Sequence, residues 1–152
     1  MDEAFERALR YLGYRARSAA EVSSYLRRRG GTDAVIAETL AKLRRLNYIS
    51  DQTFARDWAL SRAQNQGYGP RKIEQELKTK GVNDAVIRAT VREIFEQESE
   101  EQRARKVLQK RFKSENFQEP RALSRAVAFL QRRGYSSQVI FALLGYSIDD
   151  NC

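Results

Sequence analysis

The sequence contains no histidine and a single cysteine, and these two absences exclude most enzyme chemistries. Histidine is the commonest general base and a frequent zinc ligand, so serine–histidine and cysteine–histidine catalysis and zinc sites are excluded. Cys152, the last residue, cannot form a disulfide within the chain, which is typical of a reducing compartment, and we expect it at a frayed terminus. No GxGxxG or phosphate-loop lysine motif is present. We therefore expect a protein that is not an enzyme and holds no cofactor or metal.

Long apolar runs are also missing. No stretch approaches the roughly 20 apolar residues that a membrane span requires. Residues 2–12 are amphipathic and acidic, unlike a signal peptide. We expect a cytoplasmic protein with no membrane partner.

Positive charge is the most prominent feature that is present. The chain has 28 Lys and Arg against 20 Asp and Glu, a net charge of +8 over 152 residues. Residues 1–50 and 98–152 are basic, whereas residues 51–97 are nearly neutral. This distribution predicts attraction to a polyanion along the molecule rather than at one tail. A charge-rich helical surface with no such partner is the alternative.

The clearest helical pattern runs from Asn47 to Gly81. Ser50 and Asp51 can cap a helix whose apolar face carries Phe54 and Trp58. The run 67–70, Gly-Tyr-Gly-Pro, then makes a tight corner, because glycine reaches positive φ cheaply and proline is favoured at the first helical position. The motif comprises Phe54, Trp58, Tyr68, Gly69, Pro70, Ile73, Leu77 and Gly81. Here Ile73 and Leu77 point inward, and Gly81 ends the second helix.

The same pattern of caps, apolar spacing and terminal glycines predicts about nine short helices and no strands. They cover residues 2–12, 18–29, 32–46, 50–66, 70–80, 83–97, 98–113, 120–133 and 136–144, and Ser18 with Glu21 forms a capping box. The expected core residues outside the central stretch are Phe5, Leu9, Leu12, Val22, Tyr25, Leu26, Val35, Ile36, Leu40, Leu43, Val86, Ile87, Val91, Ile94, Ala104, Val107, Leu108, Phe112, Leu123, Val127, Leu130, Val139, Ile140, Leu143 and Leu144. The fold class is therefore all-α.

A repeat appears when the glycines that end helices are superposed. A leucine stands four residues before Gly30, Gly81 and Gly134, and an apolar pair follows each glycine at the same distance. The period of about 50 residues corresponds to three helices per unit. We predict three tandem three-helix repeats, 1–49, 50–97 and 98–152, in an elongated, curved array. A compact nine-helix globule is the alternative.

Cations cluster at the basic end of the middle helix of each repeat. These candidate binding residues are Arg27, Arg28 and Arg29, then Lys78 and Lys80, then Arg132 and Arg133. One cation at a helix C-terminus stabilises the dipole by roughly 0.3–1 kcal/mol, so dipole partners are the alternative interpretation. Recurrence of two or three at matching positions favours an anionic partner.

Two further features could bind a ligand. Arg71 and Lys72 stand at a helix start, where cations oppose the dipole. Trp58 and Tyr68 could stack on bases, although Trp58 shares a face with Phe54, and for that residue the core interpretation is favoured.

These residues carry a resemblance to a known family. Arg17-Ser18 with Glu21 and Leu26, Tyr48 to Asp51, Phe54 to Arg56, Tyr68 to Ile73, and Glu76-Leu77 with Lys80 to Val82 resemble the RecX family of bacterial regulatory proteins. The resemblance covers most of the chain, strongly over 15–95 and weakly beyond. It departs in the third repeat, where Ser147 replaces an expected apolar residue and the last helix stops at Gly145.

The resemblance implies a cytoplasmic modulator of the RecA recombinase. It implies binding to RecA and to its filament on single-stranded DNA, with inhibition of filament growth, ATP hydrolysis, strand exchange and co-protease action. Bare DNA is a further candidate partner, and we expect a monomer. The alternative function is a free-standing helix-turn-helix DNA-binding regulator, which would need Arg, Asn or Gln exposed along one groove-entering helix.

Overall fold

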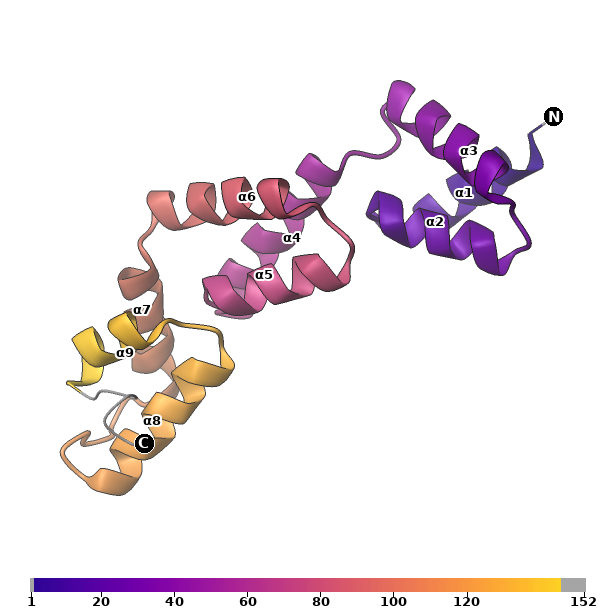
Figure 1. Ribbon diagram of the computed structural model, residues 1–152. Coiled ribbons are helices and arrows are strands. Elements are labelled where there is room, and N and C mark those ends of the chain that lie inside the picture. The colour runs from indigo at the N-terminus through magenta and orange to yellow at the C-terminus, as the bar shows by residue number, and fades with distance from the viewer. Residues whose placement is uncertain (1, 146–152) are drawn as a thin grey trace. The chain divides into compact units, whose positions relative to one another are not determined.

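The structure, a computed structural model, describes residues 2–145 and contains nine α-helices and no strand within them (Figure 1). The helices are α1 (Glu3–Leu12), α2 (Ala19–Arg28), α3 (Asp33–Arg45), α4 (Asp51–Asn65), α5 (Pro70–Thr79), α6 (Asp84–Gln97), α7 (Glu100–Arg111), α8 (Pro120–Arg132) and α9 (Ser137–Leu144). The all-α prediction is confirmed. Cys152 and Ser147 lie outside the described residues.

Short polar side chains begin the helices where the sequence predicts. Ser18 accepts a hydrogen bond from the Glu21 N–H, and the Glu21 carboxylate accepts one from the Ser18 N–H, which completes the predicted capping box of α2. Thr32 and Ser136 cap α3 and α9 in the simpler way, each accepting from a backbone N–H three residues later. These caps satisfy donors that would otherwise have no partner at a helix start.

The glycine that ends the middle helix of each repeat, here named the glycine stop, has the same backbone geometry in all three repeats. Gly30, Gly81 and Gly134 have φ values of 87°, 77° and 90°, in the left-handed region that favours glycine. The residue after each glycine donates its N–H to a leucine carbonyl five residues earlier, over 2.9, 3.1 and 3.1 Å. The accepting leucines are Leu26, Leu77 and Leu130, all buried. The sequence repeat is therefore a repeat of C-capping geometry.

The helices α1, α2 and α3 pack against one another and enclose a small apolar core. Its buried members are Ala8, Ala19, Val22, Leu26, Ile36, Leu43 and Ile49. The prediction that Val35 points inward is wrong, because this side chain is 38% exposed. Thr39, one helical turn further along α3, is buried, and its hydroxyl donates to the Val35 carbonyl over 2.7 Å.

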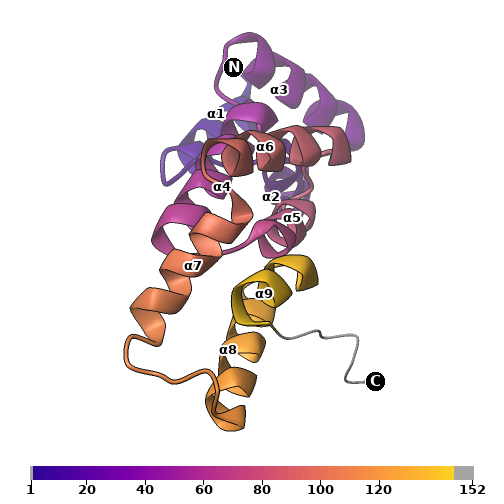
Figure 2. The ribbon, with the colours of Figure 1, turned by 90° about the vertical axis from the view of Figure 1, so that its left-hand side faces the viewer.

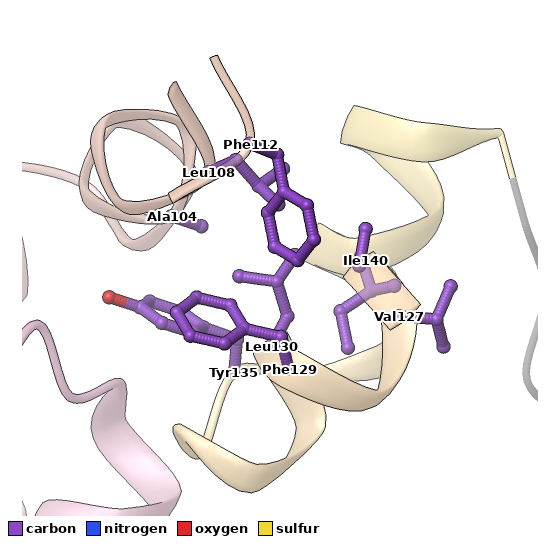
Figure 3. Close-up of a cluster of buried hydrophobic side chains, with 9 residues drawn as sticks. Ala104, Leu108, Phe112, Val127, Phe129, Leu130, Tyr135 and Ile140 are labelled. Carbon is purple, nitrogen blue, oxygen red and sulfur yellow. The ribbon is translucent and has the colours of Figure 1, made fainter. Parts of the chain in front are cut away.

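The helices α7, α8 and α9 form a second three-helix core, and they lie together in both ribbon views (Figures 1 and 2). Figure 3 shows its buried side chains converging, with Phe112 between α7 and α8. The Phe112 ring contacts Phe129 edge to face, with centroids 5.5 Å apart. Leu130 and Ile140 are completely buried here, as predicted.

The chain divides into two compact units whose boundary falls within α4, α5 and α6. The N-terminal unit comprises the described residues of Met1–Trp58 and Leu77–Ile87, and the C-terminal unit those of Ala59–Glu76 and Arg88–Cys152. The two compact units therefore do not coincide with the three predicted repeats. The repeat boundaries at 49/50 and 97/98 and the elongated, curved shape remain predictions.

The described residues contain neither a candidate membrane span nor a candidate metal site. None of their helices is both long and apolar enough to cross a bilayer. Within the same stretch, no three His, Cys, Asp or Glu side chains gather where they could hold a metal ion.

Candidate binding surfaces

Successive repeats meet inside each unit at a junction built around a glycine stop. In the N-terminal unit this contact, here named the Ser18 junction, consists of Ser18, Ala20, Glu21, Lys80 and Gly81. The buried Ser18 hydroxyl donates to the Lys80 carbonyl over 2.6 Å. A Cβ atom on Gly81 would overlap the Ala20 side chain. The glycine therefore allows α2 to approach the end of α5.

The C-terminal unit has an equivalent contact, here named the Gly69 junction, built from Gly69, Arg71, Lys72, Arg133, Gly134 and Tyr135. The Gly69 N–H donates to the Arg133 carbonyl over 2.6 Å, and the Arg71 N–H donates to the Gly134 carbonyl over 3.0 Å. A Cβ atom on Gly134 would overlap the backbone of Lys72. Here a glycine N–H replaces the serine hydroxyl as the donor.

The Gly69 junction also contains a buried tyrosine. The Tyr135 hydroxyl donates to the Gly67 carbonyl over 2.8 Å. Figure 3 shows this hydroxyl pointing away from Ile140 and Val127. Burial raises the pKa of Tyr135, so the phenol stays neutral and remains a donor.

The junctions separate the predicted cations into two sets. The first set consists of the residues immediately before each glycine, Arg29, Lys80 and Arg133, each placed over an aromatic ring. Arg29 lies 5.2 Å from the centroid of the Tyr25 ring, Lys80 lies 4.9 Å from Trp58 and Arg133 lies 4.8 Å from Phe129. Such cation–π contacts hold the side chain against its own protein.

Lys80 and Arg133 have further intramolecular partners. The Lys80 ammonium pairs with the Glu21 carboxylate at 3.3 Å. The Arg133 guanidinium donates to the Gln66 carbonyl and also lies over the Tyr68 ring. These two predicted ligand-binding residues are therefore committed in large part to the junctions.

The second set lies further from the glycine and faces solvent. It contains Arg27, Arg28, Lys78 and Arg132, all exposed. Arg27 pairs with Asp33 at 3.1 Å, but both side chains are largely exposed, and such surface pairs stabilise by only about 0–1 kcal/mol. Among residues 2–145, no acidic side chain pairs with Arg28, Lys78 or Arg132. These three cations remain available for an external anion.

The two cations predicted to bind a ligand at the start of α5, Arg71 and Lys72, also differ in exposure. Arg71 is exposed, and only its backbone N–H takes part in the Gly69 junction. The Lys72 ammonium lies 4.8 Å from the Tyr68 ring and is half-buried. By unit, Arg27, Arg28, Arg29, Lys78 and Lys80 belong to the N-terminal unit, and Arg71, Lys72, Arg132 and Arg133 to the C-terminal unit.

The predicted structural motif lies mostly in the interior. Phe54, Gly69, Ile73 and Leu77 are buried, while Trp58, Tyr68 and Pro70 are half-buried and Gly81 is exposed. The Trp58 ring stacks on Phe54 with centroids 5.8 Å apart and carries Lys80 as well. Trp58 and Tyr68 are poor stacking platforms, because each half-buried ring already has two neighbours, Phe54 and Lys80 for Trp58 and Lys72 and Arg133 for Tyr68.

Sequence reasoning missed a buried arginine in the C-terminal unit. Arg103 is only 8% exposed, and its guanidinium donates to the carbonyls of Glu98 and Ile94 over 3.1 and 3.3 Å. It thus caps the end of α6, which has no basic residue in its last turn. The signal in the sequence is its place one helical turn before the predicted core residue Val107, which puts both on one face.

A hollow of about 670 Å³ lies beside this arginine, wholly within the C-terminal unit. Its basic lining residues are Arg103, Lys106, Lys110, Arg111 and Arg133. Lys106 pairs with Glu98 at 2.9 Å, and its hydrogen bond holds the pKa of that carboxyl below the ordinary value. Since Arg103 and Arg133 donate to backbone carbonyls, much of this positive charge serves the scaffold.

Comparison with family models identifies all three repeats. The models for the first, second and third three-helix domains of RecX match residues 4–43, 50–91 and 98–144. The chain also resembles, with TM-scores of 0.80 and 0.78, the crystal structure of RecX from Lactobacillus salivarius and that of a further regulatory protein RecX. The chain covers 93% and 71% of those structures at 21% and 24% identity, and 94% of this chain is aligned in each, so they show the fold.

Curated relatives show the family. The regulatory protein RecX of Corynebacterium efficiens is 36% identical over 97% of this chain and 73% of its own length. That of Amycolatopsis mediterranei is 37% identical over 88% and 76%. The chain spans about half the length of the Bacillus subtilis relative, at 34% identity. The three matched domains and these identities together establish that the chain belongs to the RecX family of regulatory proteins.

Proposed function

We propose that this protein is a non-enzymatic modulator of RecA. It binds RecA and the RecA filament on single-stranded DNA, and inhibits filament growth together with ATP hydrolysis, strand exchange and co-protease action. Membership of the RecX family supports a regulatory role. The absence of histidine from the sequence agrees with a role in binding rather than catalysis.

The observation that carries the proposal is the set of exposed cations without acidic partners. Arg28 and Lys78 lie in the N-terminal unit, and Arg71 and Arg132 lie in the C-terminal unit. A RecA filament on DNA offers anions of two kinds, phosphates and acidic side chains. Because each unit carries its own cations, a second contact would follow the first as an intramolecular step and strengthen binding.

The helix-turn-helix alternative fits this distribution less well. A base-reading helix presents Arg, Asn or Gln along the face that enters the groove. Here the unpaired cations stand near helix ends: Arg28 and Lys78 close α2 and α5, Arg132 closes α8, and Arg71 opens α5. Such positions suit contact with a charged surface.

The proposal is tested by adding the protein to preformed RecA filaments on single-stranded DNA. Substoichiometric protein should lower the DNA-dependent ATPase of RecA, and the protein alone should hydrolyse neither ATP nor DNA. A pull-down with and without DNA and nucleotide separates binding to free RecA from binding to the filament. Unchanged RecA turnover across a full titration would overturn the proposal.

A further inference from the structure

A small basic hollow lies beside the Ser18 junction, wholly within the N-terminal unit. It has a volume of about 330 Å³. The basic residues that line it are Arg15, Arg17, Arg28 and Lys80, and Glu21 is the one acidic residue among its lining residues. Arg15 and Arg17 stand outside the predicted binding set, so this hollow brings new cations together with a predicted one.

The single carboxylate is fully engaged. Glu21 pairs with Arg15 at 2.6 Å and with Lys80 at 3.3 Å, and it accepts the Ser18 N–H at 3.1 Å. Burial alone would raise the pKa of Glu21, but the hydrogen bonds from Arg15 and Ser18 and the charges of Lys80 and Arg15 hold it below its ordinary value. Glu21 is therefore ionised, and its charge is already shared between two cations.

Arg17 is held in place but lacks an acceptor. Its guanidinium lies 4.0 Å from the centroid of the Tyr11 ring, which stacks on Tyr25 at 4.1 Å with the planes 4° apart. The Arg17 Nε is buried, and among residues 2–145 no atom accepts a hydrogen bond from it. Buried donors in folded proteins are nearly always satisfied, and a charged one is the most costly to leave unpaired. The Nε itself is covered by protein, so a ligand in the hollow would meet the terminal nitrogens of Arg17, which likewise donate to no acceptor in the described part of the chain.

We propose that this hollow binds a phosphate group, with Arg17 and Arg28 as its principal donors. Arg28 is exposed at the rim, and no acidic side chain in the described part of the chain pairs with it. The cations come from three segments, the turn before α2, the end of α2 and the end of α5. Donors from several directions suit a tetrahedral group better than a planar carboxylate, and arginine matches phosphate geometry.

The aromatic residues beside the hollow determine whether it can bind a base as well as a phosphate. One face of Tyr11 is covered by Arg17 and the other by Tyr25, so the ring has no face left for a nucleic-acid base. The hollow should therefore take the phosphate of a single strand without regard to sequence. This inference deepens the proposed function, since it assigns the nucleic-acid strand to the N-terminal unit, but its test needs no RecA.

The test compares four full-length variants by fluorescence anisotropy with labelled oligothymidylate across a salt series. Arg17→Gln and Arg28→Gln each remove a proposed contact. Arg17→Lys keeps the charge but loses the forked donor geometry of the guanidinium group. Arg45→Gln is the matched control, because Arg45 is exposed on α3 and does not line the hollow.

We expect Arg17→Gln and Arg28→Gln each to weaken binding about tenfold, since a charged hydrogen bond is lost. Each should also reduce the single-strand salt slope by about 0.7. Arg17→Lys should lose most of the affinity as well, whereas Arg45→Gln should change it less than about twofold. Arg28→Gln, a surface change, keeps the test valid if Arg17→Gln unfolds the protein, which circular dichroism would reveal.

A second experiment distinguishes free inorganic phosphate from the backbone phosphates of a nucleic-acid strand. Inorganic phosphate is titrated into the wild type and into Arg28→Gln while backbone amide chemical shifts are followed. Saturable shifts around Arg17 that vanish in the variant would mean that the free ion also occupies the hollow. Their absence, together with the DNA effect, would assign the site to the backbone of a strand; both results support the proposal.

The proposal is overturned if Arg17→Gln and Arg28→Gln bind both probes as well as Arg45→Gln does. If these variants bind DNA normally but inhibit RecA poorly, the hollow contacts acidic protein surface. In that case the phosphate assignment fails, whereas the proposed function stands. If the wild type does not inhibit RecA but the variants still weaken DNA binding, the proposed function fails and the phosphate assignment stands.

Discussion

The Ser18 junction and the Gly69 junction solve the same packing problem with different chemistry. In both, the carbonyl before a left-handed glycine accepts a hydrogen bond, from the Ser18 hydroxyl in one and the Gly69 N–H in the other. The first adds an ion pair between Glu21 and Lys80, and the second adds the buried Tyr135 hydroxyl. The glycine and its carbonyl are thus the shared geometry, and the donor is interchangeable.

The comparison also explains why a cation precedes each glycine. Lys80 and Arg133 supply the accepting carbonyl while their side chains pack on aromatic rings. Arg29 occupies the same place in the first repeat, but a Cβ atom on Gly30 would meet nothing within 4 Å. The cation–ring contact is therefore present in every repeat, whereas a close neighbour at the glycine is present only where two repeats meet.

Replacing the junction glycines should have the largest effect. Gly134→Ala places a Cβ against the Lys72 backbone and Gly81→Ala places one against Ala20, both at positive φ. Strain of about 1–2 kcal/mol adds to overpacking of about 1–3 kcal/mol, so we expect losses of roughly 3 kcal/mol in the free energy of unfolding. Gly30→Ala, the matched control, should cost only about 1–2 kcal/mol. Equal losses for all three in urea unfolding would mean that the junctions do not require close approach.

Removing the serine donor should have an intermediate effect. Ser18→Ala deletes the cap of α2 and leaves the Lys80 carbonyl without its 2.6 Å partner. We expect a loss of about 2–3 kcal/mol, the sum of a cap and an unsatisfied buried acceptor. Thr32→Ala removes a cap alone, from exposed Thr32, and should cost about 1 kcal/mol. The junction bond would be unimportant if thermal or urea unfolding gave the two variants the same stability.

The smallest expected effect is the pH dependence of the ion pair in the Ser18 junction. The pKa of Glu21 is lower in the folded protein than its ordinary value of 4.5, so the unfolded chain binds the proton more readily. The stabilisation is therefore full above about pH 4.5 and is lost as the pH falls through the folded pKa. Glu21→Gln should remove this dependence at a cost of about 1 kcal/mol at pH 7. Urea unfolding at pH 7 and pH 3 measures it, and identical pH profiles for the wild type and Glu21→Gln would contradict the ion-pair account.

Local signals made most of the fold predictable. Caps such as Ser18 and stops such as Gly81 act within one turn of chain, so they can be recognised without tertiary information. Val35 was predicted to point inward because it is apolar, whereas Thr39, a polar residue of the same helix, is the one that is buried. Its hydroxyl is satisfied by the Val35 carbonyl, which allows burial of the side chain along the stripe of Ile36 and Leu43.

The candidate site was predictable only in outline. Charge and recurrence locate the basic helix ends, but they do not show which cation is already engaged. That depends on partners distant in sequence, Trp58 and Glu21 for Lys80 and Gln66 for Arg133. Arg17 escaped notice as a site residue because its environment, the Tyr11 and Tyr25 stack, forms only when α1 packs on α2.

The central claim is that the exposed, unpaired cations, and not those committed to the junctions, act on RecA. It is tested most directly by titrating filaments of RecA on single-stranded DNA and measuring ATP hydrolysis. The wild type is compared with the double variant Arg28→Glu, Arg132→Glu and with the control Arg44→Glu, Arg45→Glu, which changes exposed residues of α3. Urea unfolding should show stabilities within about 0.5 kcal/mol for each surface change, plus a helix-dipole term of similar size that the control shares, because all four residues lie in the last turn of a helix.

We predict that the wild type and the control inhibit at substoichiometric concentration. The double variant should need at least about tenfold more protein for the same inhibition, because attraction becomes repulsion at two contacts. Inhibition by the double variant equal to that of the control, with folding intact, would contradict the account.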